Sequence, residues 1–242
     1  MATLLSIVQD VAKLGGFAVP NVAFGSAEET PRLLVACASR AAMSLMKRHH
    51  WDVITKEATI TTSSGQETYD LPSDYDRTVG DTAWDRANYE RLTGPLSPVD
   101  WQVLKSSQIT IGTDRRFRFK VTALVTKIYV DPIPTVNGNI LVYEYVSREW
   151  AKTAAGTAIN AWTADTNILL LDDNLLTLGT LWRFLNRLGL QYVEEKDEYE
   201  RELSQAIARD RGGGVNTLSI VPGHSSRFLS PSNIPDGNFP TN

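Results

Sequence analysis

Residues 51–65, which read WDVITKEATITTSSG, mark the point at which the sequence pattern of the chain changes. β-Branched side chains dominate this stretch and Ser63-Ser64-Gly65 is typical of a turn, so we expect strands to begin here. A mostly strand-like pattern continues to about Trp150, and helical patterns lie on both sides of it. The sequence therefore predicts an α+β fold, in which N- and C-terminal helices form a bundle around a central β-rich module.

Two helices are predicted before this stretch. Apolar residues spaced three and four apart predict a short amphipathic helix over residues 3–14, followed by Gly15. Residues 26–29 (SAEE) are typical of a capping box, and we expect a second helix from there to about His50, with Pro31 in its first turn. The basic side of this second helix comprises Arg32, Arg40, Lys47 and Arg48.

Three features are predicted within the β-rich region. Residues 117–121 (FRFKV) alternate as a half-buried strand does. Asn137-Gly138 lies between strand patterns at 127–130 and 140–146 and predicts a β-hairpin, because both residues tolerate positive φ. Residues 97–101 (SPVDW) predict a short helix with an N-cap serine and a first-turn proline.

Helical patterns return after Trp162. Asp172 is the expected cap of a helix that ends at Gly189, and a last helix is expected from about Glu194 to Arg209. The apolar stripe of the first comprises Leu175, Leu178, Trp182, Leu185 and Leu188. The second is expected to bury Tyr199, Leu203 and Ile207. Its exposed acidic side comprises Glu194, Glu195, Asp197, Glu198, Glu200 and Glu202.

The last residues are rich in Gly, Pro, Ser and Asn, a composition that cannot build a core of its own. We therefore expect a helical bundle domain from residues 1–51 and 163–211, a β-rich module over 52–162, and an extended C-terminal tail over 212–242.

The composition is that of a globular protein. The 242 residues include 24 Lys and Arg against 28 Asp and Glu, a net charge of -4, which argues against a sequence-reading DNA binder with a basic face. The single Cys37 cannot form an intrachain disulfide and fits a reducing compartment. The N-terminus lacks the basic start of a signal peptide, and the longest aliphatic stretch, 168–171, is too short to cross a bilayer. We expect a soluble protein.

Motifs for catalysis or metal binding are missing from the sequence. It contains no GxxxxGK[ST], GxGxxG, HExxH or CxxC pattern, and Gly223–Arg227 only approaches GxSxG within the tail. His49-His50 is interpreted as a helix-end pair rather than as metal ligands. The carboxylates around Tyr75 (Asp70, Asp74, Asp76 and Asp81) are interpreted as turn residues. We therefore predict no enzyme activity, no cofactor and no metal.

Two further features bear on binding. Residues 114–120 alternate basic and aromatic side chains, which predicts a strand with cations on one face. A half-buried strand with a solvated basic face is the favoured interpretation, and contact with nucleic acid or an acidic partner surface is the other. The residues concerned are Arg115, Arg116, Arg118 and Lys120. Four tryptophans lie in loops or at element ends, where interface hot spots and core burial are equally consistent with the sequence: Trp84, Trp101, Trp150 and Trp162.

Several stretches together resemble the head-to-tail adaptor (connector) proteins of tailed bacteriophages, in particular the tail tubular A type of short-tailed phages. They are YDLPSDYDR at 69–77, DTAWDR at 81–86, GPLSPVDW at 94–101, LGTLWRFL at 178–185, GLQY at 189–192 and EYE at 198–200. The resemblance extends over about residues 26–210. The long Pro- and Gly-containing tail and an insertion over 102–119 depart from the family.

The resemblance implies a dodecameric ring beneath the portal protein that continues the DNA channel and receives the tail nozzle or the next tail ring. It also implies a bundle docked to the portal, a β module facing the tail, and a position at the head–tail junction of a virion assembled in the bacterial host cytoplasm. No catalysis is implied. The alternative from another class is a carbohydrate-binding β module with helical appendages, in which exposed Trp and Tyr would stack on sugars.

We predict that neighbouring copies meet head to tail, with the basic side of the second helix against the acidic side of the last helix. The predicted interface residues are Arg40, Lys47, Arg48, Glu194, Glu195, Glu198 and Glu202. Double-stranded DNA is expected to pass through without strong binding, because the chain is acidic. The tail is expected to be disordered in the free protein and to order on the portal or a neighbour by strand addition. Its predicted portal-binding residues are Thr217, Leu218, Ile220, Val221, Phe228 and Leu229.

Overall fold

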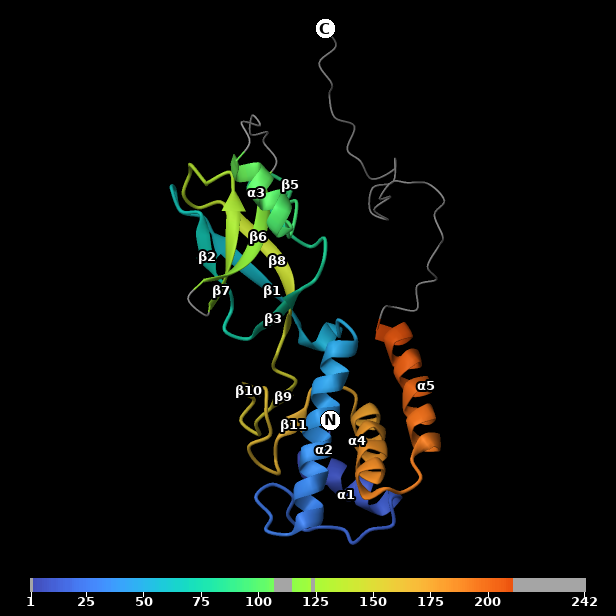
Figure 1. Cartoon of the computed structure of the whole chain (residues 1–242). Helices are drawn as coiled ribbons and strands as arrows, with labels where there is room; N and C mark the ends of the chain where they lie inside the picture. The colour runs from blue at the N-terminus through green and yellow to red at the C-terminus, as the bar shows by residue number, and fades with distance from the viewer. Residues whose placement is uncertain (1, 107–114, 123–124, 211–242) are drawn as a thin grey trace, which may run out of the picture.

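The computed structural model of the protein describes residues 2–106, 115–122 and 125–210. In Figure 1 a helical bundle lies at one end of the molecule and a β-rich module at the other. The helices near the two ends of the described chain belong to the bundle, and the strands between them form the module. This arrangement confirms the predicted α+β fold. The predicted tail lies outside the described residues.

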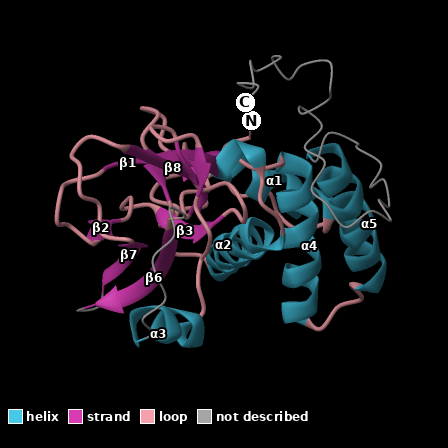
Figure 2. Ribbon diagram, turned by 90° about the horizontal axis from the view of Figure 1, so that it is seen from above, coloured by secondary structure: helices cyan, strands magenta, loops and turns pink. Residues whose placement is uncertain are grey.

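Four of the described helices form the bundle, and α4 contacts the other three. They are α1 (Leu4–Leu14), α2 (Glu29–Arg48), α4 (Asp173–Leu188) and α5 (Val193–Asp210). Figure 2 shows α2, α4 and α5 beside one another on one side of the molecule. Their apolar faces meet in one core, where Leu34, Leu176 and Phe184 are at most 1% exposed. Each such side chain contributes about 1.5–3 kcal/mol when buried, so this core is the main source of bundle stability.

The helix ends follow most of the predicted signals. Asp172 caps α4 by accepting a hydrogen bond from the Leu175 amide at 3.0 Å, and Gly189 ends that helix with a left-handed φ of 72°. The capping box is wrong: Glu28 is the N-cap of α2 and makes no side-chain cap bond. Ser26 Oγ instead accepts from the Glu28 amide at 3.2 Å, because the helix begins two residues too late for the box.

Two residues that were expected to be buried are exposed or only partly buried. Leu188, the last residue of α4, is 44% exposed. Ile207 is only partly buried against the core, and Ala206 takes the buried position on α5.

The β module consists of two antiparallel sheets and one short helix. One sheet has the order β1-β8-β4-β5 with β3 also on β8, and the other has the order β2-β7-β6. The strands are β1 (Thr55–Thr61), β2 (Thr68–Asp70), β3 (Tyr75–Thr78), β4 (Trp84–Asp85), β5 (Glu90–Arg91), β6 (Arg116–Thr122), β7 (Val125–Asp131) and β8 (Ile140–Ser147). The sheets share a core that includes Ile60, Phe117, Ile128 and Tyr143. The helix α3 (Pro98–Ser106) starts at Ser97 as predicted, with Ser97 Oγ accepting from the Asp100 amide at 3.1 Å.

The β-hairpin predicted at Asn137-Gly138 is wrong, because the strands before and after this turn do not pair with each other. Gly138 has the expected positive φ of 87°, but β7 pairs with β6 and β2, whereas β8 pairs with β1, β3 and β4. Asn137 does not have the positive φ that the hairpin turn would require. The turn extends the β1–β8 ladder, since the Gly138 amide donates to the Thr62 carbonyl at 2.9 Å. Pro132 and Pro134 follow β7 and have no amide hydrogen to donate, so the β7 ladder ends before the turn.

A neck of polar contacts joins the module to the bundle. From β3, Arg77 donates Nη2 to the carbonyls of Met46 and His49, each at 2.9 Å. The C-terminal end of α2 is therefore capped by a cation from the β module. The last residue of α5 reaches the same place: the Asp210 carboxylate lies 2.9 Å from His49 Nε2 and accepts from the Asp52 amide at 3.3 Å. Asp52 begins a short 3-10 turn (Asp52–Ile54) that precedes β1 where strand had been expected.

Asp74 holds together the strands of the module that lie next to the neck. Its carboxylate accepts from Lys56 at 2.6 Å, Ser147 at 2.8 Å and Tyr145 at 2.9 Å. Burial alone would raise the pKa of Asp74, but these hydrogen bonds outweigh burial and hold the pKa below its usual value. The carboxylate is therefore charged at neutral pH and ties β1, β8 and the loop before β3 together.

The segment after β8 returns to the bundle. It forms a small sheet of the order β10-β9-β11, from β9 (Ala151–Lys152), β10 (Ala158–Ile159) and β11 (Ile168–Leu169). Trp150 and Trp162 stack edge to face within the bundle core, with ring centroids 4.7 Å apart. The division of the chain at residue 162 stays a proposal, and this packing favours a boundary nearer to Ser147.

Candidate subunit interface

A groove between α2 and α4 forms a basic face of the bundle. It has a volume of about 820 Å³ and is lined by Leu33, Ala36, Cys37, Arg40, Trp182, Arg183, Asn186 and Arg187. The spacing of three and four residues places these side chains along facing sides of the two helices. Apolar residues form part of the lining and three guanidinium groups contribute positive charge, so the groove suits an acidic partner with some apolar surface.

Arg183 is held in place on the lining of the groove. Its guanidinium carbon lies 4.3 Å from the ring centroid of Trp182, and its Nη1 donates to the Gly179 carbonyl at 2.7 Å. Burial lowers the pKa of Arg183 from its ordinary value, although an arginine stays protonated in a protein. A Cβ at position 179 would lie 3.1 Å from Tyr199, so a glycine there permits the close packing of α4 and α5.

Cys37 lies in the same groove without a disulfide partner and is 5% exposed. Burial raises the pKa of its thiol, and the nearby charges of Arg187 and Arg183 only partly oppose this. The thiol is therefore protonated at neutral pH and acts as a small apolar side chain.

The acidic face lies on α5. A shallow concavity there is lined by Glu194, Asp197, Glu200, Arg201, Ser204 and Gln205. α5 carries seven carboxylates against three basic side chains, a net charge of -4, whereas α2 and α4 together carry six basic side chains against two carboxylates, a net charge of +4. One bundle thus presents two surfaces of opposite charge.

Most of the predicted interface residues lie on these two surfaces, and one is engaged in an ion pair within its own chain. Arg40 lines the groove and Lys47 is exposed near the end of α2. Arg48, by contrast, pairs with Glu200 of its own chain at 2.8 Å. On α5, two of the predicted residues are exposed (Glu194, Glu198) and two are half-buried (Glu195, Glu202). Sequence reasoning missed Arg183 and Arg187, although their spacing of four residues beside an apolar stripe was visible.

The basic strand predicted at 115–120 is only partly available to a partner. Arg115 is committed to Asp85, with Nη1 2.7 Å from a carboxylate that is fully buried. Arg116, Arg118 and Lys120 lie on the face of β6 opposite Phe117 and Phe119, as the alternation predicts. Lys120 Nζ lies 4.9 Å from the ring centroid of Trp101 and 4.4 Å from that of Tyr129, so α3 and β7 flank this face.

The structure decides the open interpretation of the four tryptophans. Trp101, Trp150 and Trp162 are at most 5% exposed and belong to the protein interior, whereas Trp84 is 44% exposed. Only Trp84 remains as a candidate contact residue among the four. The predicted tail residues, 217–229, lie outside the described residues.

The titratable groups in the described ranges support structural roles. The carboxylates around Tyr75 each have a cationic partner, as in the 2.9 Å pair of Asp70 with Lys127 and the 2.7 Å pair of Asp76 with Arg77. His49 contacts the Asp210 carboxylate through Nε2. In the described part of the chain no three His, Cys, Asp or Glu side chains gather where they could hold a metal ion. None of the described helices has the length and apolar character needed to span a bilayer.

A bundle with oppositely charged surfaces, joined to a rigid β module, defines a protein suited to association with other chains. Comparison with known families identifies one such class: residues 2–220 match the family described as SU10 adaptor protein. The chain belongs to the SU10 adaptor family and is a structural head-to-tail adaptor of a tailed bacteriophage. No curated protein matches the chain closely enough to be compared with it. The family implies portal and tail proteins as partners and the head–tail junction as the site of action.

Proposed function

We propose that this protein forms a closed ring beneath the portal, continues the DNA channel of the virion and receives the tail nozzle or the next tail ring. The observation that supports it is the opposite charge of two surfaces on one bundle, the α2–α4 groove and α5. A surface that attracts a different surface of the next copy gives a heterologous contact, which closes into a ring when the rotation is right. The dodecameric ring number rests on the family resemblance.

In this ring the groove of one copy binds the acidic side of α5 of its neighbour. Arg183 and Arg187 meet Glu194 and Asp197 or Glu198, and the partly apolar groove lining excludes water from the contact. Such charge pairs across an interface mainly set its specificity and its rate of formation. Because exposed ion pairs are screened by salt, ring assembly is expected to weaken as the ionic strength rises.

Charge reversal tests the proposal. Arg187→Glu and Glu198→Arg should each reduce ring formation, measured by mass in solution and negative-stain images and by addition to portal-bearing heads. The combination of both substitutions should restore assembly in part, since the pair is re-formed with its charges exchanged. Lys13→Glu on α1, outside the groove, is the matched control. Assembly of both single variants at the wild-type level in low salt would contradict the interface.

The proposed channel role requires that DNA is not retained during ejection. Neutralisation of phosphates by several Lys and Arg would produce strong, salt-dependent binding, and the chain is acidic instead, with a net charge of -4. We expect the free protein to bind duplex DNA weakly. Submicromolar, sequence-independent binding at physiological salt would overturn a passive channel and would make Arg116, Arg118 and Lys120 the first residues to test.

The C-terminal tail is the proposed portal-binding element. Strand addition along Thr217–Val221 would supply the backbone hydrogen bonds that side-chain burial alone cannot replace. Deletion of residues 212–242 should leave a folded, soluble chain that attaches less well to portal-bearing heads. Attachment equal to that of the full chain would exclude a role for the tail in docking.

A further inference from the structure

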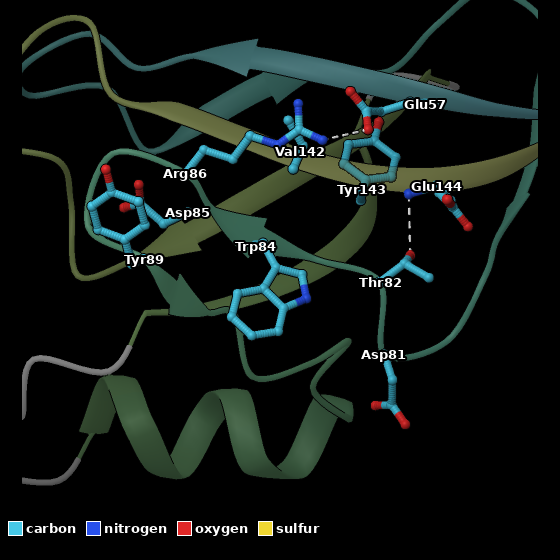
Figure 3. A pocket seen from close by; sticks show the side chains of 10 residues that line it. All are labelled: Glu57, Asp81, Thr82, Trp84, Asp85, Arg86, Tyr89, Val142, Tyr143 and Glu144. Carbon is cyan, nitrogen blue, oxygen red and sulfur yellow. Dashed lines mark hydrogen bonds and ion pairs between the residues drawn. The ribbon is translucent and has the colours of Figure 1, made fainter. Parts of the chain in front are cut away.

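A pocket on the β module is not used by the ring contact described above. It has a volume of about 710 Å³ and is lined by Glu57, Asp81, Thr82, Trp84, Asp85, Arg86, Tyr89, Val142, Tyr143 and Glu144. Figure 3 shows the indole of Trp84 between the β4–β5 turn and the loop that carries Asp81. The two aromatic side chains are open to solvent, Trp84 being 44% and Tyr89 88% exposed.

The walls of the pocket are fixed by hydrogen bonds. Asp85 is fully buried and accepts from the backbone amides of Ala87 at 2.9 Å and Asn88 at 3.1 Å, which shapes the turn that presents Tyr89. On the opposite side Thr82 Oγ1 accepts from the Glu144 amide at 3.1 Å, so the loop is tied to β8 (Figure 3). A preformed site of this kind loses little entropy when it binds a ligand.

Among the described residues, one carboxylate of the pocket has no cationic partner. Glu57 pairs with Arg86 at 2.6 Å, Asp85 pairs with Arg115 at 2.7 Å, and Asp81 pairs with Arg91. Among the described residues no Lys, Arg or His lies within ion-pair distance of the exposed Glu144 carboxylate. An unneutralised carboxylate in a pocket with two exposed aromatic rings fits a cation followed by an apolar or aromatic group.

The sequence of this chain contains such a segment beyond α5. Arg227 is the only Lys or Arg in residues 212–242, and Phe228 and Leu229 follow it directly. Sixteen residues (211–226) separate it from Asp210, and a flexible linker of that length has an r.m.s. end-to-end distance of about 20–24 Å. Asp210 is bound to the Asp52 amide at the foot of β1. From there Glu57 is five residues away, about 17 Å at most.

We infer that Arg227 and Phe228 of the chain's own C-terminal segment dock in this pocket, with Arg227 against Glu144 and Phe228 against Trp84 and Tyr89. The linker length matches the distance to be bridged, a condition under which the effective concentration of a tethered ligand is highest. The docking is independent of ring formation. It replaces the expectation of a tail that is disordered along its whole length in the free protein, and it places Thr217–Val221, the proposed portal-binding stretch, between Asp210 and the docked Arg227.

Photo-crosslinking of the full-length protein at low concentration tests the docking. With p-benzoylphenylalanine at position 228, we expect crosslinks within one chain to the peptide that contains Trp84 and Tyr89, identified by mass spectrometry. The same label at position 239 is the control and should give a lower yield there. Crosslinks only between chains, only to the bundle, or equally from both positions would overturn the proposal.

Charge exchange tests the proposed pair directly. Glu144→Arg and Arg227→Glu should each lower the crosslink yield about fivefold, as expected for loss of one ion pair and its replacement by repulsion. The double variant Glu144→Arg with Arg227→Glu should recover most of the yield, and Glu90→Arg on β5, outside the pocket, should leave it unchanged. Arg227→Glu alters none of the pocket residues, so its effect does not depend on folding. Failure of the double variant to recover, or equal loss with Glu90→Arg, would exclude this pair.

Discussion

The helical bundle and the β module achieve a fixed shape by different means. The bundle has one apolar core, and its charged side chains lie on outer faces, where Arg40 and Glu198 remain free to meet another copy. The module has an aromatic core as well, but it also buries an ion pair, since the fully buried Asp85 is held by Arg115. A surface for association can therefore be changed on the bundle with little effect on folding, whereas charges in the module are part of its fold.

The largest expected effects come from the two cores. Phe184 in the bundle is 1% exposed and packs edge to face on Phe17 at 5.0 Å, and Phe117 in the module is 2% exposed. Phe184→Ala and Phe117→Ala should each lower the free energy of unfolding by about 3–5 kcal/mol. Urea denaturation followed by circular dichroism measures this loss.

The same two substitutions test whether the bundle and the module unfold together. If the neck couples them, either substitution shifts one common transition to lower urea concentration. Two transitions, of which only one moves in each variant, would show that bundle and module are independent. Exposed Val99→Ala, on a side chain that is 70% exposed, should change little and serves as control.

The buried ion pair of the module gives the next largest effect. Arg115→Met leaves Asp85 buried without its cation, and breaking such a pair on one side costs about 3 kcal/mol. Arg118→Met on β6, the strand that follows Arg115, removes a cation on the face opposite Phe117 and should cost under ~1 kcal/mol. Thermal unfolding of both variants measures the difference. Equal stability of the two would mean that the module does not depend on its internal charges.

The contrast between the two bodies also explains what the sequence could predict. Caps and periodicity are local, so the ends of α4 at Asp172 and Gly189 were predicted correctly. Strand pairing in the module is not local: Gly138 has the expected positive φ, but the strand after it, β8, pairs with β1, which lies far back along the chain. A local turn signal predicts where the chain bends, but it does not determine which strand pairs with the strand that follows.

The candidate interface was predicted in part for the same reason. Arg40 and the acidic side of α5 follow from helical periodicity within single helices. The groove itself requires α2 and α4 to pack side by side, so Arg183 and Arg187 could be assigned to it only once that packing was known. Arg48 was placed on the correct helix face, but its partner within the chain, Glu200, depends on where α5 lies.

The neck joins the two bodies, and Arg77 is its most direct contact. Arg77→Ala removes two hydrogen bonds to the carbonyls of Met46 and His49, and we expect a loss of about 1–2 kcal/mol. The last turn of α2 should also exchange its amide hydrogens faster. Arg86→Ala, which breaks the exposed pair with Glu57, is the matched control and should cost about 0.5 kcal/mol or less. Unchanged exchange in α2 would show that the helix end does not depend on the module.

The smallest expected effect is a pH dependence that arises at Asp74. Because its pKa in the folded chain lies below the ordinary value of 3.8, the folded state binds this proton less readily than the unfolded state does. The hydrogen bonds from Lys56, Ser147 and Tyr145 therefore stabilise the fold above that value, and their contribution is lost as the pH falls through the lower folded pKa. Asp74→Asn should cost about 1 kcal/mol at neutral pH, allowing for the partly exposed Lys56 partner.

Below about pH 4 the difference between Asp74→Asn and the wild type should shrink, because the unfolded wild-type chain then takes up a proton at Asp74 more readily than the folded chain does. Asp70→Asn is the control, since that side chain is 75% exposed and its pair with Lys127 should contribute almost nothing. Urea midpoints measured from pH 3 to pH 7 separate the two. A difference for Asp74→Asn that stays constant over this range would show that the contacts of Asp74 depend on the shape of its side chain. A difference that shrinks in acid would show that these contacts, like the interior of the module, depend on charge.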